Sequence, residues 1–139
     1  MGDIFDLQRF VSAQHAVYQS VLDELRAGRK RSHWMWFIFP QIAGLGHSAM
    51  AQRYALASLD EARAYLDHAL LGTRLRECCA LLLQAEHSAH AIFGATDEMK
   101  LRSSLTLFAA AAPAESLFAA CLRQFFDGRP DAATLQRLS

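Results

Sequence analysis

Residues 34–39 read Trp-Met-Trp-Phe-Ile-Phe, an apolar run that contains both tryptophans of the chain. Alternate residues of a strand point to opposite faces, and both faces of this run are apolar, so both must be buried. Pro40 ends a helix or a strand, and six residues are too few for a separate helix. The sequence therefore predicts an extended or irregular core segment at residues 33–40.

Elsewhere the chain repeats apolar residues at the three- and four-residue steps of amphipathic helices. These repeats predict helices at residues 4–27, 48–56, 58–67, 73–86, 96–112 and 114–126. Residues 87–94 are expected to form a connection, and a short seventh helix after residue 130 is the alternative to six. We therefore predict an all-α fold of six or seven helices, forming a single domain over residues 1–139.

Three predicted helix ends have specific signals. Gly28 stands where a left-handed C-terminal cap is expected. Ser58 and Glu61 have the spacing of a capping box. Thr96 precedes Asp97, an acid that suits the positive end of a helix dipole, so we expect Thr96 to cap the helix that begins there.

Composition argues against several classes of protein. The formal net charge is zero, which gives no strong nucleic-acid signal, and no apolar run is long enough for a membrane span. The three cysteines and six histidines lack the spacing of a metal site, so neither a metal nor a cofactor is expected. The first ten residues do not resemble a signal peptide, and reduced thiols suit the cytosol, so we expect a cytoplasmic protein.

A basic turn before the apolar run provides the first candidate site. Lys30 and His33, with two arginines between residues 29 and 31, stand beside Trp34 and Trp36. Cations suit a phosphate group and an indole suits a flat ring, so this combination is typical of a phosphorylated ligand that carries a ring. The alternative is a solvated basic turn that leads into the core.

Two other polar groups are candidates for the same site. After the apolar run, a Gly-Leu-Gly turn precedes a predicted helix, where free backbone N–H groups attract anions; a simple turn and helix cap is the alternative. Cations and hydroxyls also cluster at residues 100–106, where an ordinary solvent-facing surface is the alternative. The ligand-binding candidates from these groups are Gln41, Ser48, Lys100, Arg102, Ser103 and Thr106.

Four further residues complete the candidates. Gln14 interrupts the apolar stripe of the first predicted helix, so it is either a core glutamine with satisfied hydrogen bonds or a site-facing amide that holds a ligand or orients residues 29–41. Arg53 could reach the pocket formed by residues 100–106. Asp97 and Glu24 are the candidate catalytic carboxylates. No G-x-S-x-G, H-E-x-x-H or P-loop motif is present.

Three stretches resemble a known family. They read GRKRSHWMWFIFPQIAGLGHSAMAQRYAL from residue 28, SLDEARAYLDHALLGTRL from residue 58 and IFGATDEMKLRSSLTLF from residue 92. They are similar to the signature blocks of a bacterial and fungal family of about this length, a domain of unknown function whose members are sometimes mislabelled calpastatin. Family members often have a proline and a second aspartate before the lysine of the third block, where this chain has Ala95-Thr96-Asp97-Glu98-Met99. The resemblance implies an all-α fold and no established activity.

A more distant similarity is to small α-helical proteins that process NAD- and ADP-ribose-linked metabolites by cutting N-glycosidic bonds, and no catalytic residue is carried over from it. The first hypothesis is a small hydrolase or N-glycosidase for a phosphorylated ribosyl or nucleotide-like ligand, in which an acid stabilises an oxocarbenium-like transition state. One alternative is a non-catalytic module that binds a small anion or nucleotide. The other is a protein-interaction domain that exposes Trp34 and Trp36 as an aromatic patch. The oligomeric state is left open.

Overall fold

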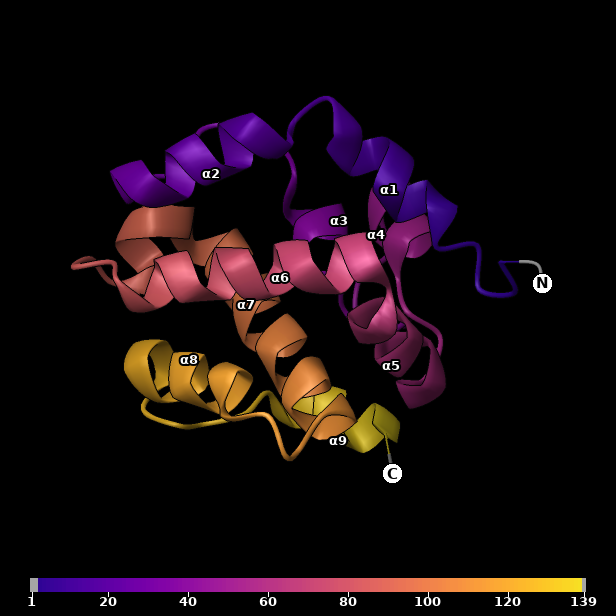
Figure 1. Ribbon diagram of the computed structural model, residues 1–139. Helices are drawn as coiled ribbons and strands as arrows, with labels where there is room; N and C mark the ends of the chain where they lie inside the picture. Colours follow the sequence, from indigo (N-terminus) through magenta and orange to yellow (C-terminus); the bar gives the residue numbers. More distant parts are fainter. Residues whose placement is uncertain (1–2, 139) are drawn as a thin grey trace.

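This computed structural model describes residues 3–138, most of which are helical (Figure 1). The predicted domain limits, residues 1 and 139, lie outside the described residues. The helices are α1 (Gln8–His15), α2 (Tyr18–Ala27), α3 (Met35–Ile38), α4 (Ala49–Tyr54), α5 (Leu59–Asp67), α6 (Ala69–Leu83), α7 (Ala89–Ala111), α8 (Ser116–Phe126) and α9 (Ala132–Leu138). The predicted all-α class is confirmed, with nine helices in the described range rather than six or seven. None of these helices combines the length and the apolar character that a bilayer crossing requires.

Helix α6 separates two groups of helices. Figure 1 shows α1 and α2 on one side of α6 and α8 and α9 on the other, while α7 crosses behind it. Helix α7 packs against α3, α5, α8 and α9. Because α7 contacts both the short α3 and the C-terminal α9, it is the element against which distant parts of the chain meet.

Three predicted boundaries were wrong. The helix predicted at residues 73–86 begins earlier, at Ala69. Residues 4–27 form two helices, since the chain breaks at Ala16 and Val17, and this break lets α1 pack against α3 while α2 packs against α6. The predicted connection at residues 87–94 is instead the start of α7, which Ser88 caps through a hydrogen bond from the Ala91 N–H. Gly94, with φ 81° and ψ 168°, interrupts the helical path just before the predicted start at Thr96.

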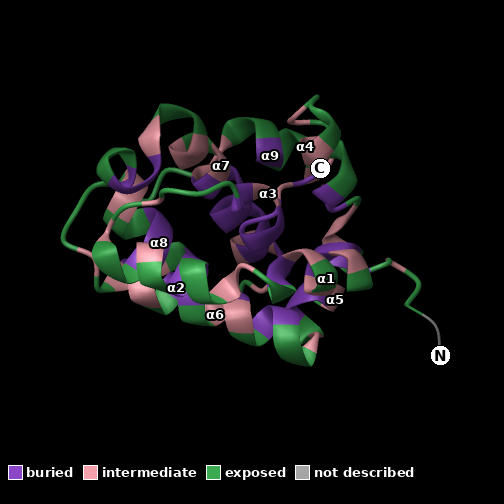
Figure 2. Cartoon of the chain, turned by 90° about the horizontal axis from the view of Figure 1, so that it is seen from above, coloured by how far each residue is buried: buried purple, intermediate pink, exposed green. Residues whose placement is uncertain are grey.

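The apolar run forms a single helical turn rather than an extended segment. Because the described chain offers no strand beside it, the N–H groups at the end of the run bond to carbonyls within the run. The Ile38 N–H donates to the Trp34 carbonyl at 3.2 Å, and the Phe39 N–H donates to the Met35 carbonyl at 3.0 Å. Five of the six side chains are buried and Trp36 is half-buried, so the predicted burial of the run is confirmed. Figure 2 shows α3 at the centre of the molecule.

A buried glutamine fixes this helical turn to the core. The Gln14 Nε2 donates to the Phe37 carbonyl at 2.7 Å and lies 3.1 Å from the Tyr65 hydroxyl, while Arg74 donates to the Gln14 Oε1 at 3.3 Å. Both ends of the amide therefore have partners inside the protein. Gln14 is a core glutamine with satisfied hydrogen bonds, and its role is to hold the residue at the middle of the apolar run.

Replacing Gln14 with leucine tests this role. We expect Gln14→Leu to lower the free energy of unfolding by about 2 kcal/mol, since it removes the donor to the Phe37 carbonyl and the acceptor for Arg74. The measurement is urea-induced unfolding followed by circular dichroism. Gln19→Leu, at an exposed position of α2, is the matched control and should change stability by less than about 0.5 kcal/mol. Equal effects of the two substitutions would contradict the assigned role.

Candidate functional site

The basic turn is held by the end of α2. Gly28 has a left-handed conformation, φ 72°, and closes α2 as predicted, because its N–H bonds back to the Leu25 carbonyl. The next hydrogen bond carries the turn across to α7: the Lys30 N–H donates to the Ile92 carbonyl at 2.8 Å. The backbone at Lys30 is therefore fixed to the start of α7, which places the lysine beside Asp97.

Glu24 accepts four hydrogen bonds from the turn and from Trp34. Its Oε1 accepts from the N–H groups of Arg31 and Ser32, at 2.6 and 2.9 Å, and from the Trp34 indole at 3.1 Å. Its Oε2 accepts from the Ser32 hydroxyl at 2.5 Å. Burial raises the pKa of Glu24, but the hydrogen bonds from Ser32, Arg31 and Trp34 outweigh burial and hold the pKa below its usual value. In this arrangement Glu24 positions the turn and lines neither of the two cavities described next.

Both lysines of the chain contact one carboxylate. The sequence contains twelve arginines and two lysines, and the lysines are Lys30 and Lys100. The Lys30 Nζ lies 2.8 Å from the Asp97 Oδ2, and the Lys100 Nζ lies 3.5 Å from the Asp97 Oδ1. The Lys30 side chain is only 8% exposed, so this cation is largely removed from water. Two ammonium groups face one carboxylate, which leaves an excess of positive charge at this point.

These three residues open onto a cavity of about 350 Å³, here called the Lys30 cavity. Its wall comes from the basic turn, from α3 and from the part of α7 around Gly94. The lining residues are Lys30, His33, Met35, Trp36, Phe93, Gly94, Ala95, Thr96, Asp97 and Lys100. Five of the sequence candidates, Lys30, His33, Trp36, Asp97 and Lys100, are thus brought to one place.

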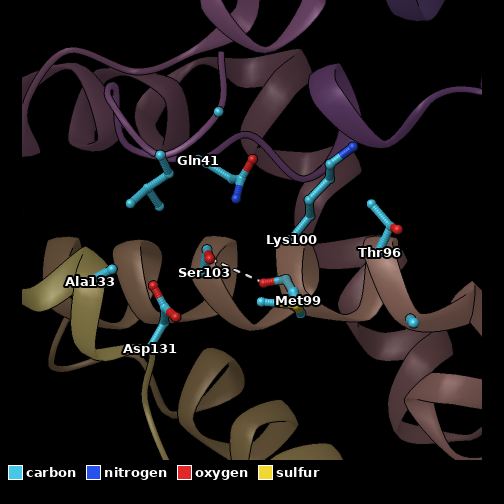
Figure 3. A pocket seen from close by; sticks show the side chains of 10 residues that line it. Gln41, Thr96, Met99, Lys100, Ser103, Asp131 and Ala133 are labelled. Carbon is cyan, nitrogen blue, oxygen red and sulfur yellow. Dashed lines mark hydrogen bonds between the residues drawn. The ribbon is translucent and has the colours of Figure 1, made fainter. Parts of the chain in front are cut away.

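A second cavity of about 420 Å³ adjoins it and is here called the Gln41 cavity. It lies between the turn that follows Pro40, helix α7 and the C-terminal segment (Figure 3). It is lined by Gln41, Leu45, Gly46, Ala95, Thr96, Met99, Lys100, Ser103, Asp131 and Ala133. Ala95, Thr96 and Lys100 line both cavities, so the polar ends of the apolar run open onto two adjoining hollows.

The two tryptophans have different environments. Trp34 is 1% exposed, packs against Phe39 and Phe93 and donates its indole N–H to Glu24, so it belongs to the core. Trp36 is half-buried and lines the Lys30 cavity, with the Lys100 Nζ 5.0 Å from the centre of its ring. The pair therefore forms no exposed aromatic patch, which removes the basis for the protein-interaction hypothesis.

The remaining sequence candidates lie elsewhere or act on the backbone. Ser48 caps α4, because its hydroxyl accepts a hydrogen bond from the Ala51 N–H. This is the helix-cap alternative considered for Ser48. Arg53 lies over the ring of Tyr54 and lines neither cavity.

Three candidates on α7 bind the protein backbone. Arg102 donates to the carbonyls of Arg129 and Pro130, at 2.9 and 3.1 Å. Thr106 accepts from the Asp131 N–H at 2.8 Å. Ser103 lines the Gln41 cavity and donates to the Met99 carbonyl.

Sequence reasoning missed Asp131. The residue follows a turn, and its place in a cavity depends on how α9 returns to α7. Its Oδ2 accepts from the Thr134 N–H at 2.9 Å and from the Thr134 hydroxyl at 2.6 Å, so it caps α9. The spacing of an aspartate and a threonine three residues later would have indicated this helix start, although it could not have placed the carboxylate opposite Gln41.

Comparison with known proteins identifies the family. The model of a family described as a protein of unknown function, DUF1810, matches residues 4–138. The chain belongs to this family. Among solved structures, the DUF1810 chain is similar to the crystal structure of the conserved hypothetical protein Rv1873 from Mycobacterium tuberculosis, with 55% sequence identity, a TM-score of 0.96 and 98% of each chain covered. No curated protein matches the chain. The predicted family resemblance is thus confirmed, and the function of this DUF1810 member has to be argued from its site.

The anchoring role of Glu24 predicts a pH dependence of stability. The pKa of Glu24 in the folded protein lies below its usual value of 4.5, so its stabilising contribution is present above pH 4.5 and is lost as the pH falls through the folded-state pKa. We expect Glu24→Gln to lower the free energy of unfolding by about 1–2 kcal/mol at pH 7. The difference from the wild-type protein should shrink in urea unfolding curves recorded at decreasing pH below 4.5.

Glu86→Gln is the control for this experiment, because Glu86 is an exposed carboxylate. It should leave stability nearly unchanged at both ends of the pH range. A Glu24→Gln effect that is the same at pH 7 and at acidic pH would show that the carboxylate charge does not hold the turn.

Proposed function

We propose that this DUF1810 protein binds a phosphorylated ribosyl or nucleotide-like ligand in the Lys30 cavity, and that it hydrolyses the N-glycosidic bond of that ligand. The observation that carries the proposal is the convergence of the only two lysines of the sequence on Asp97, beside the half-buried Trp36. A phosphate is doubly charged near neutral pH and binds ammonium groups through charge-assisted hydrogen bonds. A cavity with two lysines and one carboxylate favours such an anion.

The geometry supports separate roles for the two lysines. Lys30 is held by its backbone and lies 2.8 Å from Asp97, so its ammonium group is a fixed point of positive charge. Lys100 is farther from the carboxylate, at 3.5 Å, and its side chain is 22% exposed. The Lys100 side chain therefore reorients more easily than the Lys30 side chain when a phosphate binds. Trp36 then offers an indole face to the sugar ring that carries the phosphate.

Asp97 is the carboxylate that the proposed reaction uses. In hydrolysis of an N-glycosidic bond, the bond between the sugar C1 and the ring nitrogen breaks, a water oxygen bonds to C1, and the leaving nitrogen takes up a proton. Positive charge develops at the sugar before the water adds, and a nearby carboxylate stabilises it. When phosphate oxygens take over the contacts of Lys100, the Asp97 Oδ1 is released to face the sugar.

One observation favours a second candidate function. Both oxygens of Asp97 are ion-paired, one with each lysine, and a carboxylate neutralised in this way is a weaker stabiliser of positive charge. If the ligand leaves these pairs intact, the cavity binds an anion without reacting. The second candidate is therefore a non-catalytic module that binds a small anion or a nucleotide.

Binding and product analysis test the proposal. We expect ribose 5-phosphate, AMP, ADP-ribose or NAD to raise the thermal unfolding temperature in proportion to its occupancy. Lys30→Met and Lys100→Met should each weaken binding by about tenfold to a hundredfold, because each removes a charged hydrogen bond to phosphate. Arg123→Met removes an exposed cation from α8 and is the control for loss of charge. The binding proposal fails if no compound changes the unfolding temperature.

Turnover separates the two candidates. Chromatography of the reaction mixture should show release of the base from the bound nucleotide, and Asp97→Asn should abolish this release while phosphate binding stays equal or becomes tighter, since a negative charge has been removed from the cavity. Ligand-induced stabilisation without any product supports the non-catalytic module. Turnover that survives Asp97→Asn would contradict the role given to this carboxylate.

A further inference from the structure

We propose that the Gln41 cavity holds the second, uncharged part of the same ligand, so that the protein recognises a phosphate joined to a sugar or a base rather than a phosphate alone. This inference rests on the proposed function, because it takes the Lys30 cavity as the phosphate site. The two cavities adjoin through Ala95, Thr96 and Lys100, which line both. A ligand longer than phosphate can therefore lie in both, passing Lys100.

The two cavities differ in the net charge of their lining residues, as expected if one holds the phosphate and the other holds the uncharged part of the ligand. The Lys30 cavity is lined by two lysines and one aspartate, whereas the Gln41 cavity is lined by one lysine and one aspartate, Lys100 and Asp131. An excess of positive charge attracts the anionic part of a ligand, and a balanced set of charges does not. The Gln41 cavity thus favours a group without net charge.

Unused hydrogen-bonding groups line the Gln41 cavity. The Gln41 side chain is half-buried and, in the part of the chain that the structure describes, takes part in no hydrogen bond; Figure 3 shows its amide directed into the cavity. An amide offers two donor hydrogens and one acceptor oxygen. Opposite it, the Asp131 Oδ2 is used by Thr134, while within residues 3–138 the Oδ1 has no hydrogen-bond partner. An amide facing a carboxylate oxygen suits the hydroxyl and amino groups of a sugar or a base.

Apart from the hydroxyl side chains of Thr96 and Ser103, the rest of the wall is apolar. Leu45, Ala95 and Ala133 provide flat contact surface, and Met99, which is 68% exposed, lies at the rim. A methionine adapts its shape to different partners because its side chain is unbranched and polarizable. Apolar surface with a few directed polar groups is the usual lining of a site for a small organic molecule, and it is not needed for an inorganic anion.

Hydrogen bonds from α7 fix the C-terminal segment beside the Gln41 cavity. Arg102 holds the carbonyls of residues 129 and 130, and Thr106 accepts from the Asp131 N–H. Arg137 of α9 packs directly on Gly44, where an added Cβ atom would overlap the Arg137 guanidinium group. Arg102 and Thr106 are therefore positioning residues: they set the place of Asp131 and Ala133 without reaching the ligand themselves.

Two substitutions that leave the Lys30 cavity untouched test the inference. Gln41→Leu removes the amide, and Ala133→Trp fills the cavity from the α9 side. We expect each to weaken AMP binding by about tenfold in isothermal titration calorimetry, which corresponds to one or two lost hydrogen bonds or an equivalent steric cost. Binding of inorganic phosphate should change by less than about twofold. Lys30→Met should weaken binding of both compounds.

Ala132→Trp, at an exposed position of α9 outside the lining, is the matched control and should affect neither compound. Thermal unfolding of each variant shows whether it is folded, and Gln41→Leu keeps the test decisive if Ala133→Trp does not fold. The inference is overturned if AMP binds no tighter than phosphate, or if Gln41→Leu leaves AMP binding unchanged or weakens phosphate binding equally. If neither phosphate nor any phosphorylated compound binds the wild-type protein, the proposed function itself fails, and the inference fails with it.

Discussion

Burial of the apolar run at residues 34–39 is the constraint on which the rest of the structure depends. A run that is apolar on both faces has to pass through the core, and its backbone has to find hydrogen bonds there. The protein meets this need with one helical turn, with Gln14 bonded to the Phe37 carbonyl, and with Trp34 bonded to Glu24. Once the run is fixed, the polar residues at its two ends emerge against the same helix, α7, and each end opens onto one of the adjoining cavities.

The division of labour between arginine and lysine follows from the same arrangement. The arginines with structural roles, such as Arg9 and Arg102, bind backbone carbonyls with their forked guanidinium groups and tie segments together. The two lysines do not brace the fold in this way, and both lie at Asp97. The ammonium group of Lys100, on a flexible and partly exposed stem, can turn toward a bound anion at little cost, while Lys30 stays in place. The placement of both lysines at one cavity is therefore the feature on which the proposed site rests.

Much of this was accessible from the sequence, and the failures have physical reasons. Burial of residues 34–39 and the cap at Gly28 follow from local rules, and the structure confirms both. The break in residues 4–27 could not be predicted, because it depends on tertiary packing: α1 lies against both α3 and α6, whereas α2 packs on α6. Within the candidate site, residue type indicated cations, a ring and an acid, but not which ones would meet. Arg102 and Asp97 stand close together in the sequence, yet α7 directs Arg102 to the C-terminal turn and Asp97 to Lys30.

Lysine-selective NMR provides the most direct test of the claim that both lysines act on one anion. The chain has two lysines, so each labelled side chain gives a resolved signal near its ammonium group, and Lys30→Met assigns them. On titration with ribose 5-phosphate, both signals should shift and reach half-saturation at the same ligand concentration. If one signal does not move, or if the two saturate at clearly different concentrations, Lys30 and Lys100 do not form a single anion site.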